Sequence, residues 1–421
     1  MAMMFANFTA GWANYASGRR IRLGLALSAV VALAGCQTPT GGLEGAGTSG
    51  SAGENVNASR TGDLPDAKGE IVGTGAVRVA LLVPTTGASN ASTIATEFKN
   101  AAKMALADIG QDRIQLVIKD TRGQSGRSST LTREAIREGS QLIIGPLLSA
   151  SVASAAGVAQ PAGVPLLAFT ADTSVAKRGI YLNSFPPQID TRRVLNYAAA
   201  QGKKSIVAVL PNDAYGITVE AELRRTAQAR GMQVLAVGKY TPRGASATVQ
   251  AGINRAVLSV AAQVPNADSL FVPYQPSFAA AVMAAFNANG VSTTSKQLLG
   301  SGLWYADRAQ RNSLNGGWFA ERNRAEFQAF VDRYQALYGA VPSFNAGLGY
   351  DAVSLAVGLS AAFGAEAFTP ARLENANGFS GVTGLFRFNA QGRPERGLAI
   401  YEYTGAEPRV LSSAPTSFAG R

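Results

Sequence analysis

The stretch QLIIGPLLSASVASAAGVAQPAGVPLLAF, residues 141–169, decides the fold class. It opens with a short, branched apolar run at 141–146 and closes with another at 164–169, as expected for strands of a buried parallel sheet. Residues 149–163 between them start with a serine and end with Gly and Pro, which predicts a helix. A strand, a helix and a second strand in this order indicate a parallel α/β sheet.

The same alternation extends along the chain in both directions. On the N-terminal side we predict strands at 77–83 and 114–118 and helices at 93–109 and 126–139. A second series of strands is predicted at 203–211, 233–240, 268–274 and 296–302, with helices at 216–231, 247–263 and 277–290. Two further helices are predicted at 324–339 and 345–365. The sequence therefore predicts an α/β fold with two units in succession.

The C-terminal stretch GLFRFNAQGRPERGLAIYEYTG, residues 384–405, has a different pattern. Two runs of alternating apolar and polar residues flank a segment rich in turn-forming residues. This pattern predicts an antiparallel hairpin.

The N-terminal segment has the layout of an export signal. Arg19, Arg20 and Arg22 precede an uncharged apolar run at 23–34, which is too short for the ~20 residues that span a membrane as a helix. The run ends in Leu-Ala-Gly before Cys36, the only cysteine of the chain. This resembles the lipobox of bacterial lipoproteins, in which the thiol receives a diacylglyceryl group and the signal is cut before the cysteine. We therefore expect a signal peptide at 1–35 and lipidation of Cys36.

Residues 36–75 are expected to form a disordered tether. They are rich in Gly, Ser and Asn and nearly free of large apolar side chains, so they cannot bury a core. Residues 411–421 are expected to form a disordered tail. The formal charge of +11 falls to 35 − 27 = +8 without the three arginines of residues 1–35. No Lys/Arg-rich cluster occurs, so we expect a solvated basic surface and no nucleic-acid partner.

The composition argues against catalysis. The chain contains no histidine, which removes Ser-His-Asp and Cys-His nucleophiles and every His-containing metal site. The one thiol is expected to be lipidated. We therefore predict a binding protein that is not an enzyme and has no cofactor or metal.

Ligands of open parallel sheets bind beyond the carboxyl ends of the strands, so candidate residues follow the predicted strands. Serines at a helix start can accept an anion, although Ser149 could equally serve only as the helix N-cap. Aromatic side chains there can close over a ligand or pack between lobes. The candidate cleft residues are Thr86, Gly87, Ser149, Ser151, Thr170, Ala171, Thr173, Tyr215, Tyr274, Gln275 and Trp304.

The order of elements, with IIGPLLSASVASAA, VPLLAFTADTSVAKRG, PNDAYGITVEAELRRTAQARG and YDAVSLAVGL, resembles the type I periplasmic-binding-protein family of the leucine/isoleucine/valine-binding type. The resemblance implies two lobes, each a parallel sheet flanked by helices, joined by a hinge that the chain crosses three times. It places 76–195 and 320–380 in lobe 1, and 196–319 and 381–410 in lobe 2.

In amino-acid-binding members of that family, a serine and a threonine hold the ligand carboxylate and a tyrosine covers the ligand. The matching residues here are Ser149, Thr173 and Tyr215, with Ala171 contacting the ammonium group. An acid follows the strand corresponding to LFVPY in the family, whereas this chain has Tyr274-Gln275-Pro276 there.

The segments IIGPLLSASV, VPLLAF, GSGLWYAD and GGWFAE also resemble the penicillin-binding-protein activator lipoproteins of the LppC type. This resemblance implies a lipid-anchored, periplasm-facing protein of the outer membrane that stimulates a peptidoglycan synthase by direct contact, the interpretation we favour from the sequence. The alternative is the substrate-binding lipoprotein of an ABC importer, with an ABC permease as partner and an amino acid or small amide as ligand. A cell-wall fragment is a further candidate ligand.

Overall fold

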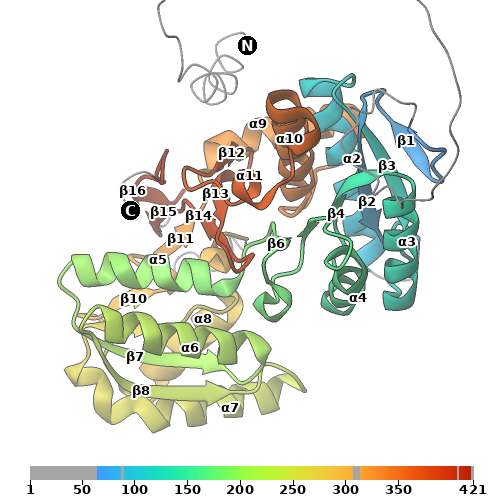
Figure 1. Ribbon diagram of the computed structural model, residues 1–421. Coiled ribbons are helices and arrows are strands. Elements are labelled where there is room, and N and C mark those ends of the chain that lie inside the picture. Colours follow the sequence, from blue (N-terminus) through green and yellow to red (C-terminus); the bar gives the residue numbers. More distant parts are fainter. Residues whose placement is uncertain (1–63, 87–89, 307–312, 405–406, 419–421) are drawn as a thin grey trace, which may run out of the picture. The chain divides into compact units, whose positions relative to one another are not determined.

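The computed structural model describes residues 64–86, 90–306, 313–404 and 407–418 (Figure 1). The predicted signal peptide, Cys36 and Gly87 lie outside this range. Three sheets organise the described chain.

The first sheet has the strand order β1-β3-β2-β4-β5-β6. Every residue of β2 is buried, Arg78 included, as its largely apolar sequence predicts. All neighbouring strands are parallel except β1, which runs antiparallel to β3. The strands are β1 (Glu70–Val72), β2 (Val77–Val83), β3 (Ile114–Asp120), β4 (Ser140–Ile144), β5 (Leu166–Ala168) and β6 (Ile180–Leu182).

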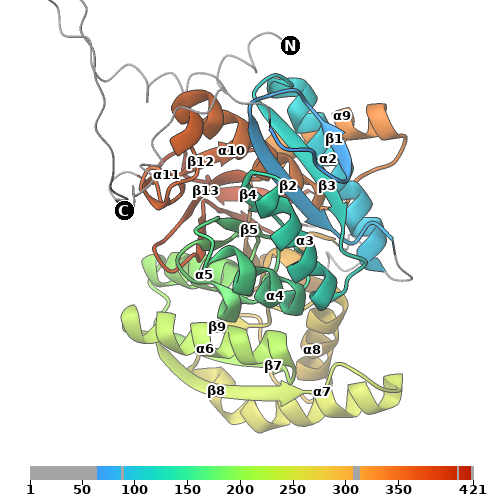
Figure 2. The same ribbon diagram turned by 45° about the vertical axis from the view of Figure 1, so that its right-hand side comes forward.

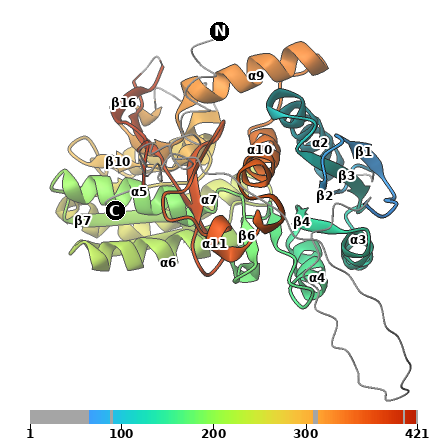
Figure 3. The ribbon, with the colours of Figure 1, turned by 45° about the horizontal axis from the view of Figure 1, so that its top comes forward.

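Helices cover both faces of this sheet. Ala80 and Leu82 of β2 pack with α3 (Ser125–Arg137) and α4 (Ser149–Ala159) in one core. On the other face, α2 (Asn90–Ile109) packs against α10 (Ala346–Phe363), as Figure 3 shows. Gly349 permits this approach, because a Cβ there would lie 2.9 Å from the backbone oxygen of Phe98.

Helix α10 is long and apolar enough to cross a membrane by length and composition. However, 78% of its apolar window is buried inside the protein. Helix α9 (Arg324–Tyr338) also contacts α2, through a hydrogen bond of 3.1 Å between Asn100 and the Tyr334 hydroxyl. The helices α9 and α10 therefore belong to the unit of the first sheet.

The second sheet has the order β16-β15-β11-β10-β9-β7-β8. The strands from β11 to β8 are parallel, and β15 and β16 continue the sheet in antiparallel pairs. The strands are β7 (Ser205–Pro211), β8 (Gln233–Tyr240), β9 (Ser269–Phe271), β10 (Gln297–Leu299), β11 (Trp318–Glu321), β15 (Ala399–Glu402) and β16 (Arg409–Ser412).

Two cores lie on opposite faces of this sheet. One contains side chains of α5 (Pro187–Ala200) and α6 (Ala214–Ala229), and the other side chains of α7 (Ser246–Val260) and α8 (Pro276–Ala288). Figure 2 shows α6 and α7 on either side of β8. Short helical segments complete the order: η1 (Thr173–Val175), η2 (Ala261–Asn266), η3 (Gly302–Ala306), η5 (Gly364–Glu366) and α11 (Pro370–Leu373).

A small third sheet, β12 (Phe379–Gly381), β13 (Gly384–Phe388) and β14 (Pro394–Arg396), is antiparallel throughout. It corrects the predicted hairpin at 384–405. Residues 384–388 do form a hairpin, but with β14, and the second run joins the second sheet through β11. The glycine at 397 and the short β14 end the hairpin before that run begins.

The structure also corrects several boundaries. Residues 70–72 of the expected tether form β1, because they find an open edge at β3. In the expected tail, residues 411–412 belong to β16 and Phe418 is buried. Helix α5 packs against α6 and β11, so the chain leaves the first unit at residues 183–186 rather than near 195. The strands β13 and β14 pair with β12 in the third sheet, whereas the family resemblance places them in lobe 2.

Candidate functional site

Two predicted residues of the first unit meet at the ends of β4 and β5. The hydroxyl oxygens of Ser149 and Thr170 lie 2.8 Å apart, and the backbone N–H of Asp172 donates to Thr170 at 3.2 Å. The N-cap of α4 is Leu148, which provides no side-chain cap, so Ser149 is not the N-cap. The first N–H groups of α4 therefore lie beside two hydroxyls, an arrangement that suits an anion.

The loop after β5 extends this polar group. Asp172 accepts hydrogen bonds from the backbone N–H and the hydroxyl of Ser174, at 3.0 and 2.6 Å, which hold its pKa below the usual range. Thr173 follows in η1 and accepts a long hydrogen bond of 3.4 Å from Gln188. Ala171 is exposed beside them. The structure thus brings Ser149, Thr170, Ala171 and Thr173 to one edge of the first sheet.

Thr86 lies at the end of β2 and is bound to Asp120 at the end of β3. Its N–H donates to one carboxylate oxygen at 3.3 Å and its hydroxyl to the other. These hydrogen bonds lower the pKa of Asp120. Thr86 is exposed, so it remains accessible at the same edge.

Two predicted cleft residues are inaccessible. Ser151 is 2% exposed within α4. Trp304 has no exposed surface, because its ring packs with Phe319 and Tyr403 at centroid distances of 6.2 and 6.1 Å. A Cβ on Gly300 would lie 2.3 Å from the Trp304 indole, which explains the glycine. Both residues therefore belong to the core, and the structure exposes neither of them to a ligand.

The predicted residues of the second unit form their own group. The Tyr215 hydroxyl donates to the carbonyl oxygen of Pro273 at 2.8 Å and lies 3.4 Å from the Ser301 hydroxyl. The Tyr215 ring packs against Tyr274 at 5.3 Å, and the Tyr274 hydroxyl donates to Asp213 at 3.5 Å. Burial raises the pKa of Tyr215, so this hydroxyl stays protonated. Gln275 is exposed at the start of α8.

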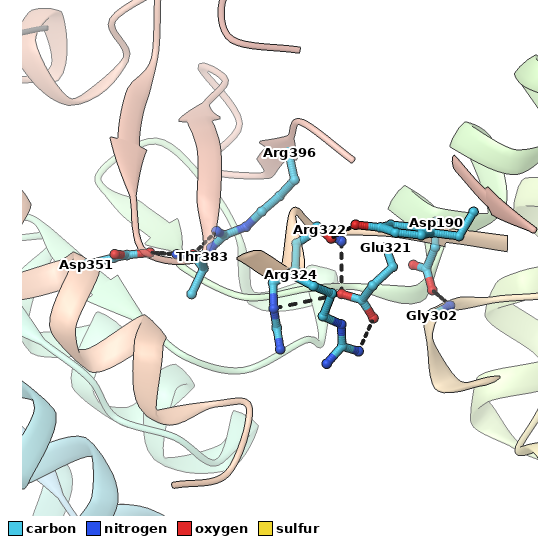
Figure 4. Close-up of polar contacts among 9 residues, drawn as sticks. Asp190, Gly302, Glu321, Arg322, Arg324, Asp351, Thr383 and Arg396 are labelled. Atoms are coloured by element: carbon cyan, nitrogen blue, oxygen red, sulfur yellow. Dashed lines mark hydrogen bonds and ion pairs between the residues drawn. The ribbon is translucent and has the colours of Figure 1, made fainter. Parts of the chain in front are cut away.

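Two acids that sequence reasoning missed lie beside this group. Asp190 of α5 accepts a hydrogen bond of 3.4 Å from the N–H of Gly302 (Figure 4). Glu321, at the end of β11, approaches the same glycine, since a Cβ on Gly302 would lie 2.9 Å from its carboxylate. Burial, with the charge of Glu321, raises the pKa of Asp190 to about 7, and the charge of Asp190 in turn raises the pKa of Tyr215.

Two arginines flank Glu321. Arg324 donates to its carboxylate at 3.1 Å and stacks on Tyr305. Arg322 is 1% exposed, and its Nε lies 3.9 Å from the same carboxylate (Figure 4). Its guanidinium lies over the rings of Phe344 and Phe327, at 3.1 and 4.0 Å. Burial lowers the pKa of Arg322 to about 9. The sequence Glu-Arg-Asn-Arg at 321–324 thus places three charged side chains at the end of β11. Their burial and their proximity to Asp190 become evident only in the fold.

A buried polar network joins the segments where the chain passes between the sheets. Arg396 donates to the carbonyl of Ser184 at 3.0 Å, to the Thr383 hydroxyl at 2.8 Å and to Asn183 at 2.5 Å. Asp351 accepts hydrogen bonds from the backbone of residues 382 and 383. Burial raises the pKa of Asp351 to about 6. These contacts use all three hydrogen-bonding arms of Arg396, so we assign it a structural role.

Rings and cations continue this network as a ladder. The Arg396 guanidinium lies 4.1 Å from the Phe185 ring, and the Phe185 ring packs edge-on against Phe344 at 4.9 Å. The guanidinium of Arg322 then lies over the rings of both Phe344 and Phe327. The cation–π ladder, residues 396, 185, 344, 322 and 327, therefore joins residues at or just after the ends of β6, β11 and β14.

Within the described residues, no group of three His, Cys, Asp or Glu side chains could hold a metal ion. The two sheets instead present hydroxyls, acids and arginines at the ends of their strands, which suits reversible binding of a small polar molecule. An α/β chain that crosses three times between two such sheets is characteristic of two-lobed binding proteins.

A family model described as periplasmic binding protein matches residues 76–407, and the chain belongs to this family. It is a family of binding proteins and not of enzymes. A search of curated proteins finds no match.

Solved structures share the fold at low identity. A branched-chain amino acid ABC transporter protein from Rhodospirillum rubrum has a TM-score of 0.68 at 19% identity, over 80% of this chain and 99% of the other. An ABC transporter substrate-binding protein from Desulfitobacterium hafniense, in complex with Leu, has a TM-score of 0.58 at 18% identity, over 80% and 99%. A solute binding protein from R. palustris, in complex with benzoate, has a TM-score of 0.55 at 19% identity, over 82% of this chain and 97% of the other. The expected two-lobed fold with largely parallel sheets is thus confirmed.

Proposed function

We propose that the protein is the solute-binding component of an ABC importer and takes a small solute that carries a carboxylate, of the amino-acid type. The observation that carries this proposal is the Ser149–Thr170 hydroxyl pair at the start of α4. Hydroxyls and helix N–H groups together bind a carboxylate without a full positive charge.

The amine of such a solute needs an acidic partner, because a buried unpaired ammonium is costly. No acid follows β9, where the family resemblance places one. Asp190 and Glu321 supply carboxylates near Tyr215 and Ser301 instead. This arrangement supports a zwitterionic ligand held between Ser149 and Asp190, with Tyr215 and Tyr274 as apolar cover.

Two neighbours in the structural comparison are described as complexes with leucine and with benzoate. They support a ligand with a carboxylate and an apolar part. An ABC permease is the corresponding partner, and the site of action is outside the cytoplasm. We retain the lipid anchor on Cys36, facing the periplasm from the outer membrane, as a prediction; mass spectrometry of the membrane-bound form tests it.

A second candidate function is the activation of a peptidoglycan synthase by direct contact. It is supported by exposed apolar side chains at the end of α9, where Leu337 and Val341 are 57% and 64% exposed. Exposed apolar side chains of this kind can contact a protein partner.

Isothermal titration of the purified protein with a panel of amino acids and aromatic carboxylates tests the first proposal. We expect saturable binding of at least one carboxylate, weakened by Ser149→Ala and by Asp190→Asn. No binding across the panel, together with recovery of a synthase by pull-down that Leu337→Asp abolishes, would favour the second function.

A further inference from the structure

A separate cavity of about 270 Å³ lies between the helices α5 and α6 and the loop that joins β13 to β14. We call it the arginine pocket. Of the candidate cleft residues, only Thr173 borders it. It is lined by Thr173, Pro186, Gln188, Ile189, Arg192, Glu222, Arg225, Asn389, Arg393, Pro394 and Glu395.

Positive charge exceeds negative charge around this cavity. Arg192 and Arg225 share one carboxylate, that of Glu222, with Nε–O distances of 3.2 and 3.0 Å. The Glu222 side chain is nearly buried, whereas the two arginines are 42% and 59% exposed. One carboxylate cannot neutralise two guanidinium groups, so one positive charge remains on this wall.

The opposite wall adds a second charge. Glu395 is neutralised by Arg387, which donates to it at 2.9 and 2.7 Å. The backbone N–H of Arg393 is held by Asn389, and its side chain is exposed. Counting Arg192, Arg225, Arg387 and Arg393 against Glu222 and Glu395 gives 4 − 2 = +2.

The start of α5 contributes to the same cavity. Its N-cap, Pro186, has no capping side chain, and its first turn lines the pocket. The positive end of the helix dipole therefore adds to the arginine charge. Gln188 is anchored to Thr173 by one long bond through Nε2, and its buried Oε1 has no hydrogen-bond partner among the described residues. Its amide can thus accept a hydrogen bond from a ligand hydroxyl.

We propose that the arginine pocket binds a small dianion with a neighbouring hydroxyl, of the phosphate-monoester type. Two uncompensated guanidinium charges from opposite walls match the two charges of such a group, and the planar forks match its oxygen geometry. The volume admits a molecule of glycerol-phosphate size but not a large one. Because the walls come from α6 and from the β13–β14 loop, the ligand bridges elements of two different sheets.

Titration of the purified protein with glycerol 3-phosphate, inorganic phosphate and acetate tests this site. We expect glycerol 3-phosphate to bind, phosphate to bind more weakly and acetate not at all. Arg393→Gln and Arg192→Gln should each weaken binding roughly tenfold, because each removes a charge-assisted contact. Arg224→Gln is the matched control, since Arg224 is equally exposed on α6 but pairs with Glu220 away from the pocket.

The same dianion could be free or carried on a lipid headgroup. Flotation with vesicles that contain phosphatidic acid distinguishes these sources, and an Arg393-dependent signal in either arm supports the site. The proposal is overturned if neither ligand form binds at millimolar concentration, or if binding persists unchanged in Arg393→Gln. Thermal unfolding of each variant verifies that the folded state is retained.

Discussion

The hydroxyl groups of Ser149 and Thr170 lie 2.8 Å apart, although 21 positions separate them in the sequence. Parallel strands deliver both residues to the same sheet edge, because β4 and β5 are hydrogen-bonded neighbours. This pair is the most direct structural support for a carboxylate site.

Replacing Ser149 by Ala should weaken solute binding about tenfold without changing the fold, since one hydrogen bond to a charged group is lost. Titration of the carboxylate that binds best measures the effect. Ser246→Ala is the matched control, because Ser246 also begins a helix after an N-cap without a side-chain bond. Equal losses in both variants would contradict a role for Ser149 in binding.

Asp190 should make stability fall as the pH rises. Its pKa is about 7 in the folded protein and ~3.9 in the unfolded chain, so the native state binds more protons between these values. The free energy of unfolding should therefore drop by up to about 1.4 kcal/mol per pH unit between pH ~4 and ~7. Urea unfolding at several pH values measures this slope.

Asp190→Asn should flatten this dependence. The pKa of Asp351 is also raised, to about 6, so this residue too lowers stability as the pH rises. Part of the slope should therefore remain in the variant. Solute affinity should show the opposite trend, rising from pH 6 to 8 in the native protein as Asp190 ionises, and losing that rise in Asp190→Asn. An unchanged affinity profile in the variant would exclude Asp190 as the partner of a ligand amine.

Gly300→Ala should destabilise the second unit by about 1–3 kcal/mol, since its methyl group would overlap the buried Trp304 ring. Denaturant unfolding followed by tryptophan fluorescence measures the loss. Gly157→Ala is the control, because Gly157 lies in α4 with no atom within 4 Å of a new Cβ. That variant should be neutral or slightly more stable.

Arg396→Met should cost about 3–5 kcal/mol, because Asp351 would lose the nearest buried positive charge and three acceptors would lose their donor. Arg393→Met, three residues away and exposed, should change stability by less than about 0.5 kcal/mol. Comparable losses in the two variants would show that the network around Arg396 contributes little to stability.

The sequence identifies the strands of the first sheet where apolar runs are continuous. The predicted strand at 77–83 has the same bounds as β2. Its seven residues are mostly apolar and branched, and all of them are buried in the sheet. The short strands β6 and β11 escape prediction. They pair with neighbours over three or four residues, so their sequences carry too little periodicity.

The candidate site divides in the same way. Ser149 and Thr170 lie within five residues of the ends of β4 and β5, which are neighbouring parallel strands, so topology alone places them together. Asp190 lies one turn inside a helix, and only the packing of α5 against β11, which also contacts η3, brings it to Gly302. Trp304 follows a strand as well, yet its ring turns into the core because Gly300 and Gly317 leave room for it there.

The ladder of Arg396, Phe185, Phe344, Arg322 and Phe327 has a mechanical consequence. A hydrogen bond weakens steeply when its angle changes, whereas a cation–π contact requires only that the cation stay over the ring face, within about 6 Å of its centroid. The contacts of Arg322 with Phe344 and Phe327 should therefore tolerate turning, whereas three hydrogen bonds hold the guanidinium of Arg396 in place. We therefore expect the chain to turn more easily beside Arg322 than beside Arg396.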